Sequence, residues 1–178
     1  MKEPSIETER LLLRMPQRID IQEVVEKIND KEIAENTSTI PYPYDASDAE
    51  IWLEKSKKLY EAGEGVNFVI TLKNSGEIVG GTGLKIEKEH QHAELGYWIA
   101  KAYRGQGICT EAAKGLIQYG FKELKLHRII AQHFSRNPGS GRVMLKIGMR
   151  HEGSFREHFL KNGQFEDAEF YSILASDL

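Results

Sequence analysis

An amphipathic helix set between two apolar strands constrains the fold of this chain more than any other feature. Residues 108–124 place apolar side chains on one helical face and polar side chains on the other, which predicts a half-buried helix. Residues 93–99 before it and 126–134 after it have the apolar composition of buried strands. A strand–helix–strand crossover makes its two strands parallel neighbours. Ligands in open sheets tend to bind at the carboxyl ends of strands, where such a crossover begins.

The rest of the sequence predicts mostly antiparallel strands with helices between them. Asn162-Gly163 has the signature of a hairpin turn and joins two strands near the end of the chain. A helix is predicted to begin at a cap provided by Ser47 or Asp48 and to end at Gly63. The fold class is therefore α/β, with a mixed, mostly antiparallel sheet flanked by helices. Further strands are predicted at 8–14, 66–72, 77–86, 153–161 and 165–174, and further helices at 19–34, 47–62 and 140–147.

Length and charge limit the classes of function that the chain can serve. A chain of 178 residues has the size of one domain, so we treat residues 1–178 as a single domain. The formal net charge of −3 argues against nucleic-acid binding, which needs an excess of Lys and Arg. No apolar run is long enough to span a membrane, and the N-terminus lacks the apolar core of a signal peptide. Because Cys109 is the only cysteine, no internal disulfide can form, and we expect a cytoplasmic protein.

The turn before helix 108–124 contains two glycines. Gly105 and Gly107 are separated by one residue, which allows a tight turn whose backbone N–H groups form a concave nest. The helix N-terminus adds its positive dipole end, so this turn suits a pyrophosphate as well as an ordinary strand-to-helix connection. A dinucleotide-binding loop fits poorly because Thr110 stands where a third glycine is needed, and a P-loop lysine is absent. Another glycine run, 80–83, lies inside a strand pattern and indicates a bulge or close packing.

Residues 104–109, with the sequence Arg-Gly-Gln-Gly-Ile-Cys, resemble the Gln/Arg-x-x-Gly-x-Gly/Ala loop of the GCN5-related N-acetyltransferases. The resemblance covers nearly the whole chain. Within the family, the chain is most similar to the branch that contains the ribosomal-protein N-terminal acetyltransferases. It implies the fold of that family, in which the fourth and fifth strands, here 93–99 and 126–134, splay apart. The other segments that match, in the order of the family, are 8–14, 41–44 with Trp52, 93–99, 137–149 and 162–167.

The resemblance implies that acetyl-CoA binds in the cleft between the splayed strands. Backbone N–H groups of residues 105–110 would hold the pyrophosphate, and Arg104 would lend charge nearby. The pantetheine arm would run like an extra strand beside residues 97–99, and Asn137 would contact the same arm. The residues expected to bind the cofactor are Tyr97, Trp98, Ile99, Arg104, Gly105, Gln106, Gly107, Ile108, Cys109, Thr110 and Asn137.

Amide formation requires a neutral amine, although free amines are largely protonated at neutral pH. Glu94 is our candidate for the general base because its strand leads to the splay; the alternative is a glutamate that pairs across the sheet. Ser140 is our candidate for protonating the departing thiolate, and the alternative is a helix N-cap. Met144 stands where many relatives carry a tyrosine that performs this protonation, and solvent would also suffice. A fourth-strand backbone N–H is the usual donor to the oxyanion in this family.

Two further chemistries receive little support from the sequence. A covalent acetyl-enzyme on Cys109 is disfavoured, because in the family fold this residue faces the pyrophosphate rather than the thioester. His90 and His92 have the spacing of metal ligands but lack a third ligand, so we predict no metal site.

We expect the acceptor cleft to be walled by residues 37–44 and by the hairpin around Asn162-Gly163. Carboxylates near that hairpin would attract a cationic amine or form a solvated face: Glu157, Glu166, Asp167 and Glu169.

The sequence thus predicts an enzyme that moves acetyl from acetyl-CoA to a primary amine by direct attack in a ternary complex. A protein N-terminus is the expected acceptor, and a small amine such as a polyamine, amino sugar or antibiotic is the alternative. A hypothesis of another class is a non-catalytic module that binds or senses CoA, for which Met144 is the only sequence support. The resemblance allows a homodimer, and we expect neither nucleic-acid nor membrane partners.

Overall fold

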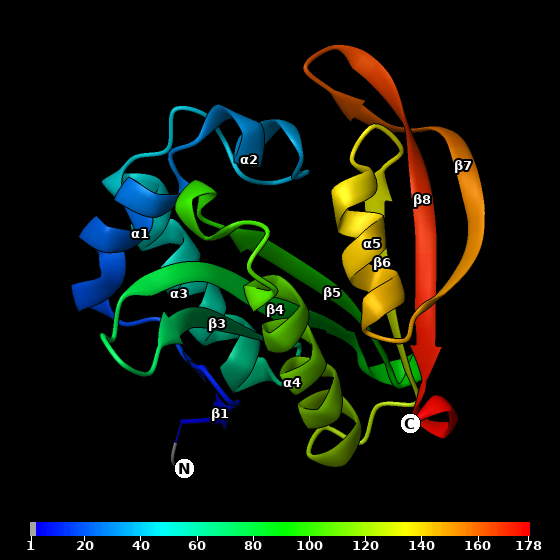
Figure 1. Ribbon diagram of the computed structural model, residues 1–178, viewed down its shortest axis with the longest axis horizontal. Coiled ribbons are helices and arrows are strands. Elements are labelled where there is room, and N and C mark those ends of the chain that lie inside the picture. Colours follow the sequence, from blue (N-terminus) through cyan, green and yellow to red (C-terminus); the bar gives the residue numbers. More distant parts are fainter. Residues whose placement is uncertain (1–2) are drawn as a thin grey trace.

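The computed structural model describes residues 3–178, which form one 8-stranded sheet with the spatial order β1-β2-β3-β4-β5-β6-β8-β7 (Figure 1). The strands are β1 (Ser5–Glu7), β2 (Leu11–Arg14), β3 (Gly65–Leu72), β4 (Ile78–Glu87), β5 (His92–Ile99), β6 (Arg128–Phe134), β7 (Arg150–Lys161) and β8 (Gln164–Leu174). The α-helices are α1 (Ile21–Ile28), α2 (Lys31–Glu35), α3 (Ala46–Ala62), α4 (Ile108–Lys122) and α5 (Pro138–Lys146).

The contact between β5 and β6 confirms the predicted crossover. Within residues 3–178 these two strands are parallel, whereas all other strand pairs are antiparallel. The chain leaves β5, runs through α4 and returns in β6. The mixed, mostly antiparallel sheet expected from the sequence is therefore present.

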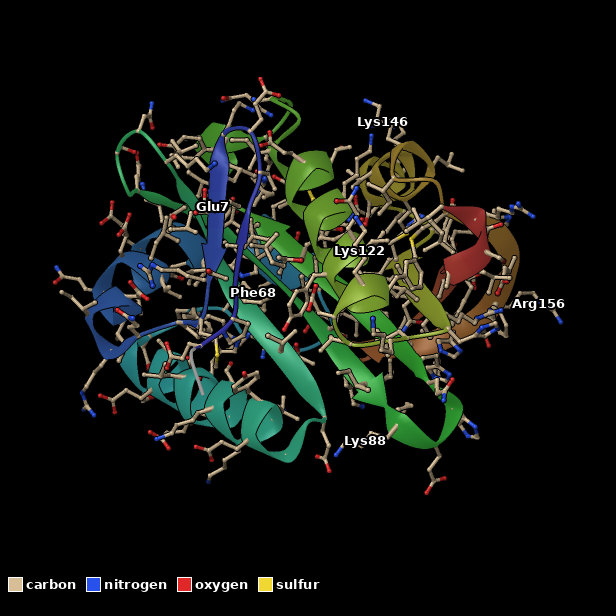
Figure 2. All side chains as sticks on the ribbon, turned by 90° about the horizontal axis from the view of Figure 1, so that it is seen from below. Glu7, Phe68, Lys88, Lys122, Lys146 and Arg156 are labelled. Carbon is tan, nitrogen blue, oxygen red and sulfur yellow. The ribbon has the colours of Figure 1, made fainter. Side chains whose placement is uncertain are left out.

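Helices cover both faces of the sheet. Phe68 on β3 packs in the larger core with Leu116 and Ile117 of α4, whereas the next residue, Val69, packs with Val24 of α1. Since neighbouring strand residues point to opposite faces, α4 and α1 lie on opposite sides. Helix α3 joins α1 in the smaller core, and β1 lies beside α4 on the other face (Figure 2).

The N-terminal strand differs from the prediction. The segment expected as one strand over 8–14 is the second half of a hairpin, in which β1 pairs with β2. The Thr8 N–H donates to the Leu11 carbonyl at 3.0 Å and closes the turn between them. This extra strand shifts the count, so the predicted fourth and fifth strands are β5 and β6.

Two helix boundaries also differ, for local reasons. The helix predicted over 19–34 is interrupted, because the Asp30 side chain accepts the Glu32 N–H at 2.9 Å and starts α2 afresh. Helix α3 is capped by Asp45 rather than by Ser47 or Asp48, and Asp48 completes a capping box by accepting the Asp45 N–H. Its predicted end at a left-handed glycine, Gly63 (φ 65°), is confirmed.

The glycine run in β4 permits close packing, as predicted. A Cβ atom on Gly81 would lie 2.5 Å from Nε1 of Trp98, so only glycine leaves room for this indole ring against the sheet. The register between β3 and β4 also shifts between Ile70 and Thr71, opposite the same run. The indole ring packed against Gly81 lines the cleft described below.

No helix among residues 3–178 has the length and apolarity needed to cross a membrane. The same residues contain no group of three His, Cys, Asp or Glu side chains arranged to hold a metal ion.

Candidate active site

The site is built on the early separation of β5 and β6. These strands pair in three rows, of which Glu94 opposite Ile130 is the last. Beyond that row β5 pairs only with β4, and β6 pairs only with β8. Figure 1 shows the two strands together at their N-terminal ends and apart at their C-terminal ends. The separation opens a cleft of about 1190 Å³, and it leaves the backbone groups that face the gap without ladder partners.

The turn before α4 has the geometry of an anion-binding loop. Gly105 (φ 75°) and Gly107 (φ 76°) are both left-handed, and a Cβ atom on Gly105 would enter open space. Gly107 is the N-cap of α4 and, as a glycine, supplies no side-chain cap. The N–H groups of the first helical turn therefore remain available at the positive end of the helix dipole. Ile108, Cys109 and Thr110 belong to this turn and line the cleft.

A clamp from the N-terminal hairpin holds this loop in place. The Arg10 guanidinium donates to the Gln106 carbonyl at 3.1 Å and to the Glu111 carboxylate at 2.6 Å. Glu111 also accepts from the Thr8 hydroxyl and from the Arg10 N–H, at 2.6 and 2.7 Å. Burial alone would raise the pKa of Glu111, but these hydrogen bonds and the charge of Arg10 lower it instead. The loop is thus anchored to the β1–β2 turn, a segment predicted from the sequence as part of a strand over 8–14.

Two residues of the predicted cofactor set have different partners from those expected. Arg104 lines the cleft, but its guanidinium pairs with Asp30 at 3.0 Å and with Glu32 at 2.6 Å, so its charge is neutralised by the start of α2. Arg104 thus lies at the cleft where we expected it to lend charge, but two carboxylates share that charge. Gln106 does not line the cleft, because its side chain donates to the Ala102 carbonyl at 2.9 Å.

The remaining predicted cofactor residues line the cleft. Asn137 occupies the N-cap of α5 without making a side-chain cap hydrogen bond, so its carboxamide remains available to a ligand. Sequence reasoning did not consider Arg142 and Lys146, which also line the cleft and bring positive charge to it. Their spacing of four residues on a short helix is the signal that could have placed both on one face. These predicted residues line the cleft: Tyr97, Trp98, Ile99, Gly105, Gly107, Ile108, Cys109, Thr110 and Asn137.

Glu94 lies half-buried at the point where the strands part. Its Oε1 accepts a hydrogen bond from Nε2 of Gln132 on β6 at 2.7 Å. Both residues line the cleft. The glutamate therefore makes the cross-strand contact of our alternative interpretation, and its place in the lining of the cleft is compatible with the predicted role of a base. Gln132 was missed, although its place two residues after Ile130 puts it on the same face of the strand.

Ser140 is not a helix cap. Helix α5 begins at Pro138 with Asn137 as its N-cap, so Ser140 lies in the first turn and the N-cap alternative is wrong. Its hydroxyl lies 2.8 Å from the Tyr97 hydroxyl, which also donates to the Ser140 carbonyl at 3.1 Å. Burial, with a smaller contribution from nearby Cys109, raises the pKa of Tyr97, so this phenol stays protonated. A tyrosine from β5 thus contacts the serine, whereas Met144 is buried and has no hydroxyl to offer.

The thiol of Cys109 is unsuited to nucleophilic attack. Burial raises the pKa of this thiol to about 12. It therefore stays protonated at neutral pH, and the thiolate is the nucleophilic form. This agrees with the low weight that the sequence gave to a covalent acetyl-enzyme.

The acceptor side of the cleft is bounded by the segment after α2 and by the β6–α5 loop. Arg136 donates to the Glu35 carbonyl at 2.6 Å and to the Asn36 side chain at 2.9 Å. Lys161 at the end of β7 donates to the Thr37 carbonyl at 2.7 Å. The first two contacts tie the β6–α5 loop to the end of α2, and the third ties the terminal hairpin to the segment after α2. Residues 37–41 line the cleft as expected, and so does Tyr44, which also belongs to the smaller hydrophobic core. Of the terminal hairpin only Phe159 lines the cleft, so the turn at Asn162-Gly163 is not the wall that we expected.

Three of the four carboxylates that we placed near the terminal hairpin have partners within the hairpin or in the β6–α5 loop. Glu169 accepts from Ser154, Ser135 and His151, each at 2.7 Å, and these hydrogen bonds lower the pKa of Glu169 to about 2. Glu166 pairs with Arg136 at 2.9 Å. Asp167 accepts the Glu157 N–H at 2.7 Å. Glu166, Asp167 and Glu169 therefore have hydrogen-bond or ion-pair partners within the protein.

Comparison with known proteins identifies the family. The sequence profile of the Acetyltransferase (GNAT) domain matches residues 10–150. The chain belongs to the GNAT acetyltransferase family. It is 34% identical to the uncharacterized N-acetyltransferase YnaD of Bacillus subtilis over 174 residues, which cover 97% of this chain and 98% of that protein. A crystal structure of a GNAT-family acetyltransferase from Bacillus anthracis is 30% identical and superposes with a TM-score of 0.87, covering 97% of this chain and 99% of that one.

A further relative places the chain near acetyltransferases of ribosomal proteins. The [ribosomal protein uS5]-alanine N-acetyltransferase of Escherichia coli is 30% identical over 83 residues, which cover 47% of this chain and 43% of that protein. With the family profile and the full-length relatives, this makes the protein an acetyl-CoA-dependent N-acetyltransferase.

Proposed function

We propose that this enzyme acetylates the α-amine of a protein N-terminus, by direct attack of that amine on acetyl-CoA in a ternary complex. The observation that carries this proposal is the cleft that passes through the sheet between β5 and β6. The first turn of α4 lines it on one face, and residues 36–41 with Trp52 line it on the other. Donor and acceptor can therefore be bound together, which direct transfer requires.

The relative that acts on ribosomal protein uS5 supports the choice of an N-terminus. Its substrate residue is alanine, whose side chain carries no nitrogen, so the acetylated amine there is the backbone α-amine. Free α-amines have a pKa near ~8 and lysine side chains near ~10.4. An N-terminus is therefore the easier of the two to deprotonate at neutral pH. We place this reaction in the cytoplasm and assign it to residues 1–178 acting as one domain.

The residues of the cleft can divide the chemistry as follows. Backbone N–H groups at residues 105 and 107–110 bind the pyrophosphate, and the unpaired backbone of β5 binds the pantetheine arm. The neutral amine attacks the thioester carbon through its lone pair, and Glu94 takes a proton from the nitrogen as the C–N bond forms. A β5 N–H that faces the gap donates to the oxyanion, a contact worth ~3–4 kcal/mol in comparable enzymes.

The thiolate leaves with the electron pair of the C–S bond and takes a proton from Ser140. Ser140 regains a proton from solvent, and Glu94 releases its proton to solvent, before the next cycle. When Tyr97 donates to the Ser140 oxygen atoms, the serine proton is free to be given into the cleft. The Tyr97–Ser140 pair would thus perform the protonation that many relatives assign to a tyrosine at the position of Met144. With this pair in place, Met144 would no longer argue for a non-catalytic CoA-binding module, which the following test distinguishes.

A screen of acceptors tests the proposal. The enzyme is incubated with isotopically labelled acetyl-CoA and equal concentrations of peptides that begin with Ala or Ser, the same peptides with a blocked N-terminus and an internal lysine, spermidine and glucosamine. We expect mass spectrometry to find the label on the free α-amines. Label confined to the small amines would favour the alternative substrate class. CoA binding without label on any amine would favour the non-catalytic module.

A further inference from the structure

A carboxamide oxygen at the point where the strands part has no partner. Oε1 of Gln132 is buried and makes no hydrogen bond within residues 3–178, although Nε2 of the same group donates to Glu94 at 2.7 Å. The carboxylate fixes the orientation of the amide, because only the NH₂ group can donate to it. A buried acceptor without a donor costs free energy, so such an oxygen calls for a ligand that supplies an N–H or O–H.

Gln132 lies beside Glu94, the residue that we propose as the base for the reacting amine. Gln132 lies two residues beyond Ile130, the last residue of β6 that pairs with β5, and it lines the cleft. It shares a strand face with Ile130 and Phe134, opposite to the face on which Ala131 packs against the core of α4. Gln132 occupies one oxygen of Glu94 and leaves Oε2 of that carboxylate to take a proton.

We propose that Gln132 and Glu94 together form a two-acceptor subsite that selects primary amines. This inference rests on the proposed transferase reaction but is independent of whether the acceptor is a peptide or a small molecule. A primary amine that attacks through its lone pair retains two N–H bonds. One proton is transferred to Oε2 of Glu94 as the C–N bond forms, and the other N–H donates to Oε1 of Gln132 and remains in the amide product. A secondary amine has a single N–H and leaves the Gln132 oxygen unpaired.

The test compares one peptide that begins with Ala with the same peptide beginning with N-methyl-Ala. In the unmodified enzyme we expect kcat/KM to favour the primary amine by at least tenfold. In Gln132→Met the side chain keeps its length but loses both polar atoms, and the preference is expected to fall several-fold. Gln118→Met, on the exposed face of α4, is the matched control and keeps the preference of the unmodified enzyme. A merely structural role for Gln132, or one limited to orienting Glu94, would slow both peptides equally.

An unchanged preference in Gln132→Met would overturn the inference, and so would equal rates for both peptides in the unmodified enzyme. If Gln132→Met does not fold, Gln132→Asn withdraws the carboxamide by one carbon and gives the same comparison. If peptides are not acetylated but spermidine is, the comparison uses a primary amine and its N-methyl derivative of that class. The proposed acceptor then fails while the subsite is still tested. An enzyme that acetylates no amine refutes both.

Discussion

The assignment of the anion-binding loop can be tested with two glycines that share a backbone conformation. Gly105 in the loop and Gly76 in the β3–β4 turn both have φ of 75°, and at both a Cβ atom would meet nothing within 4 Å. Replacement by alanine therefore introduces the same left-handed strain at each, worth ~1–2 kcal/mol. For a chain of this size we expect the Tm of both variants to fall by roughly 2–8 °C.

Cofactor binding should separate the two variants. CoA at about 100 times its Kd adds ~2.7 kcal/mol to stability, which raises Tm by roughly 5–10 °C. Gly76→Ala keeps this shift because its turn lies away from the cleft. In Gly105→Ala the added methyl group stands where the backbone must approach the phosphate oxygens. A hundredfold loss of affinity would leave about 0.4 kcal/mol, or roughly 1–2 °C. Equal shifts measured by thermal unfolding would refute the assignment of the loop.

Three further substitutions test other parts of the structure. Tyr97→Phe removes the hydroxyl that contacts Ser140. Because one hydrogen bond is worth ~0.5–1.5 kcal/mol, we expect kcat to fall about 2–10-fold and the KM for acetyl-CoA to stay unchanged. An unaltered kcat in steady-state assays would exclude a role of Tyr97 in proton donation by Ser140. The pKa of Glu169 is lowered from 4.5 to about 2, so its contribution to stability is complete above pH 4.5 and is lost as the pH falls towards 2. In denaturant titrations we expect Glu169→Gln to be less stable than the unmodified protein at neutral pH and equally stable near pH 2. A stability difference that does not change with pH would contradict this. Gly81→Ala forces the Trp98 indole to move, which should cost ~1–3 kcal/mol and lower Tm by about 2–12 °C; an unchanged Tm would mean that the ring has space to shift freely.

Regular local patterns allowed much of the fold to be predicted. The apolar repeat of α4 between two apolar strands predicted the strand–helix–strand crossover. The Asn-Gly pair at 162–163 predicted the β7–β8 turn, in which both residues are left-handed. The break between α1 and α2 was missed because both helices bury apolar residues in one core, so Ile28 and Ile33 continue the expected pattern. The backbone leaves the helical conformation at Asn29 (ψ 61°), and the capping contact of Asp30 starts the second helix.

The site was predictable where it depends on backbone conformation and less so where it depends on distant side chains. Gly105 and Gly107 predict the loop before α4 from their spacing alone, because glycine adopts the left-handed backbone conformation that the turn needs. The partners of Arg104, by contrast, lie 74 and 72 positions away, and Gln132 lies 38 positions from Glu94. The Arg104 pairs depend on how α2 packs beside the loop after β5, and the Gln132–Glu94 pair depends on how β5 and β6 diverge. No local pattern encodes either arrangement.

The divergence of β5 and β6 also has a consequence for folding. Each strand presents a row of backbone groups to the gap, so the protein has two sheet edges in its interior as well as two at its ends. Open edges invite pairing with another strand, and proteins usually cover or interrupt them. Here an extended ligand with amide groups of its own can act as the missing strand and join the two halves of the sheet. Its concentration in the cell would then help to set the lifetime of the folded protein as well as the rate of the reaction.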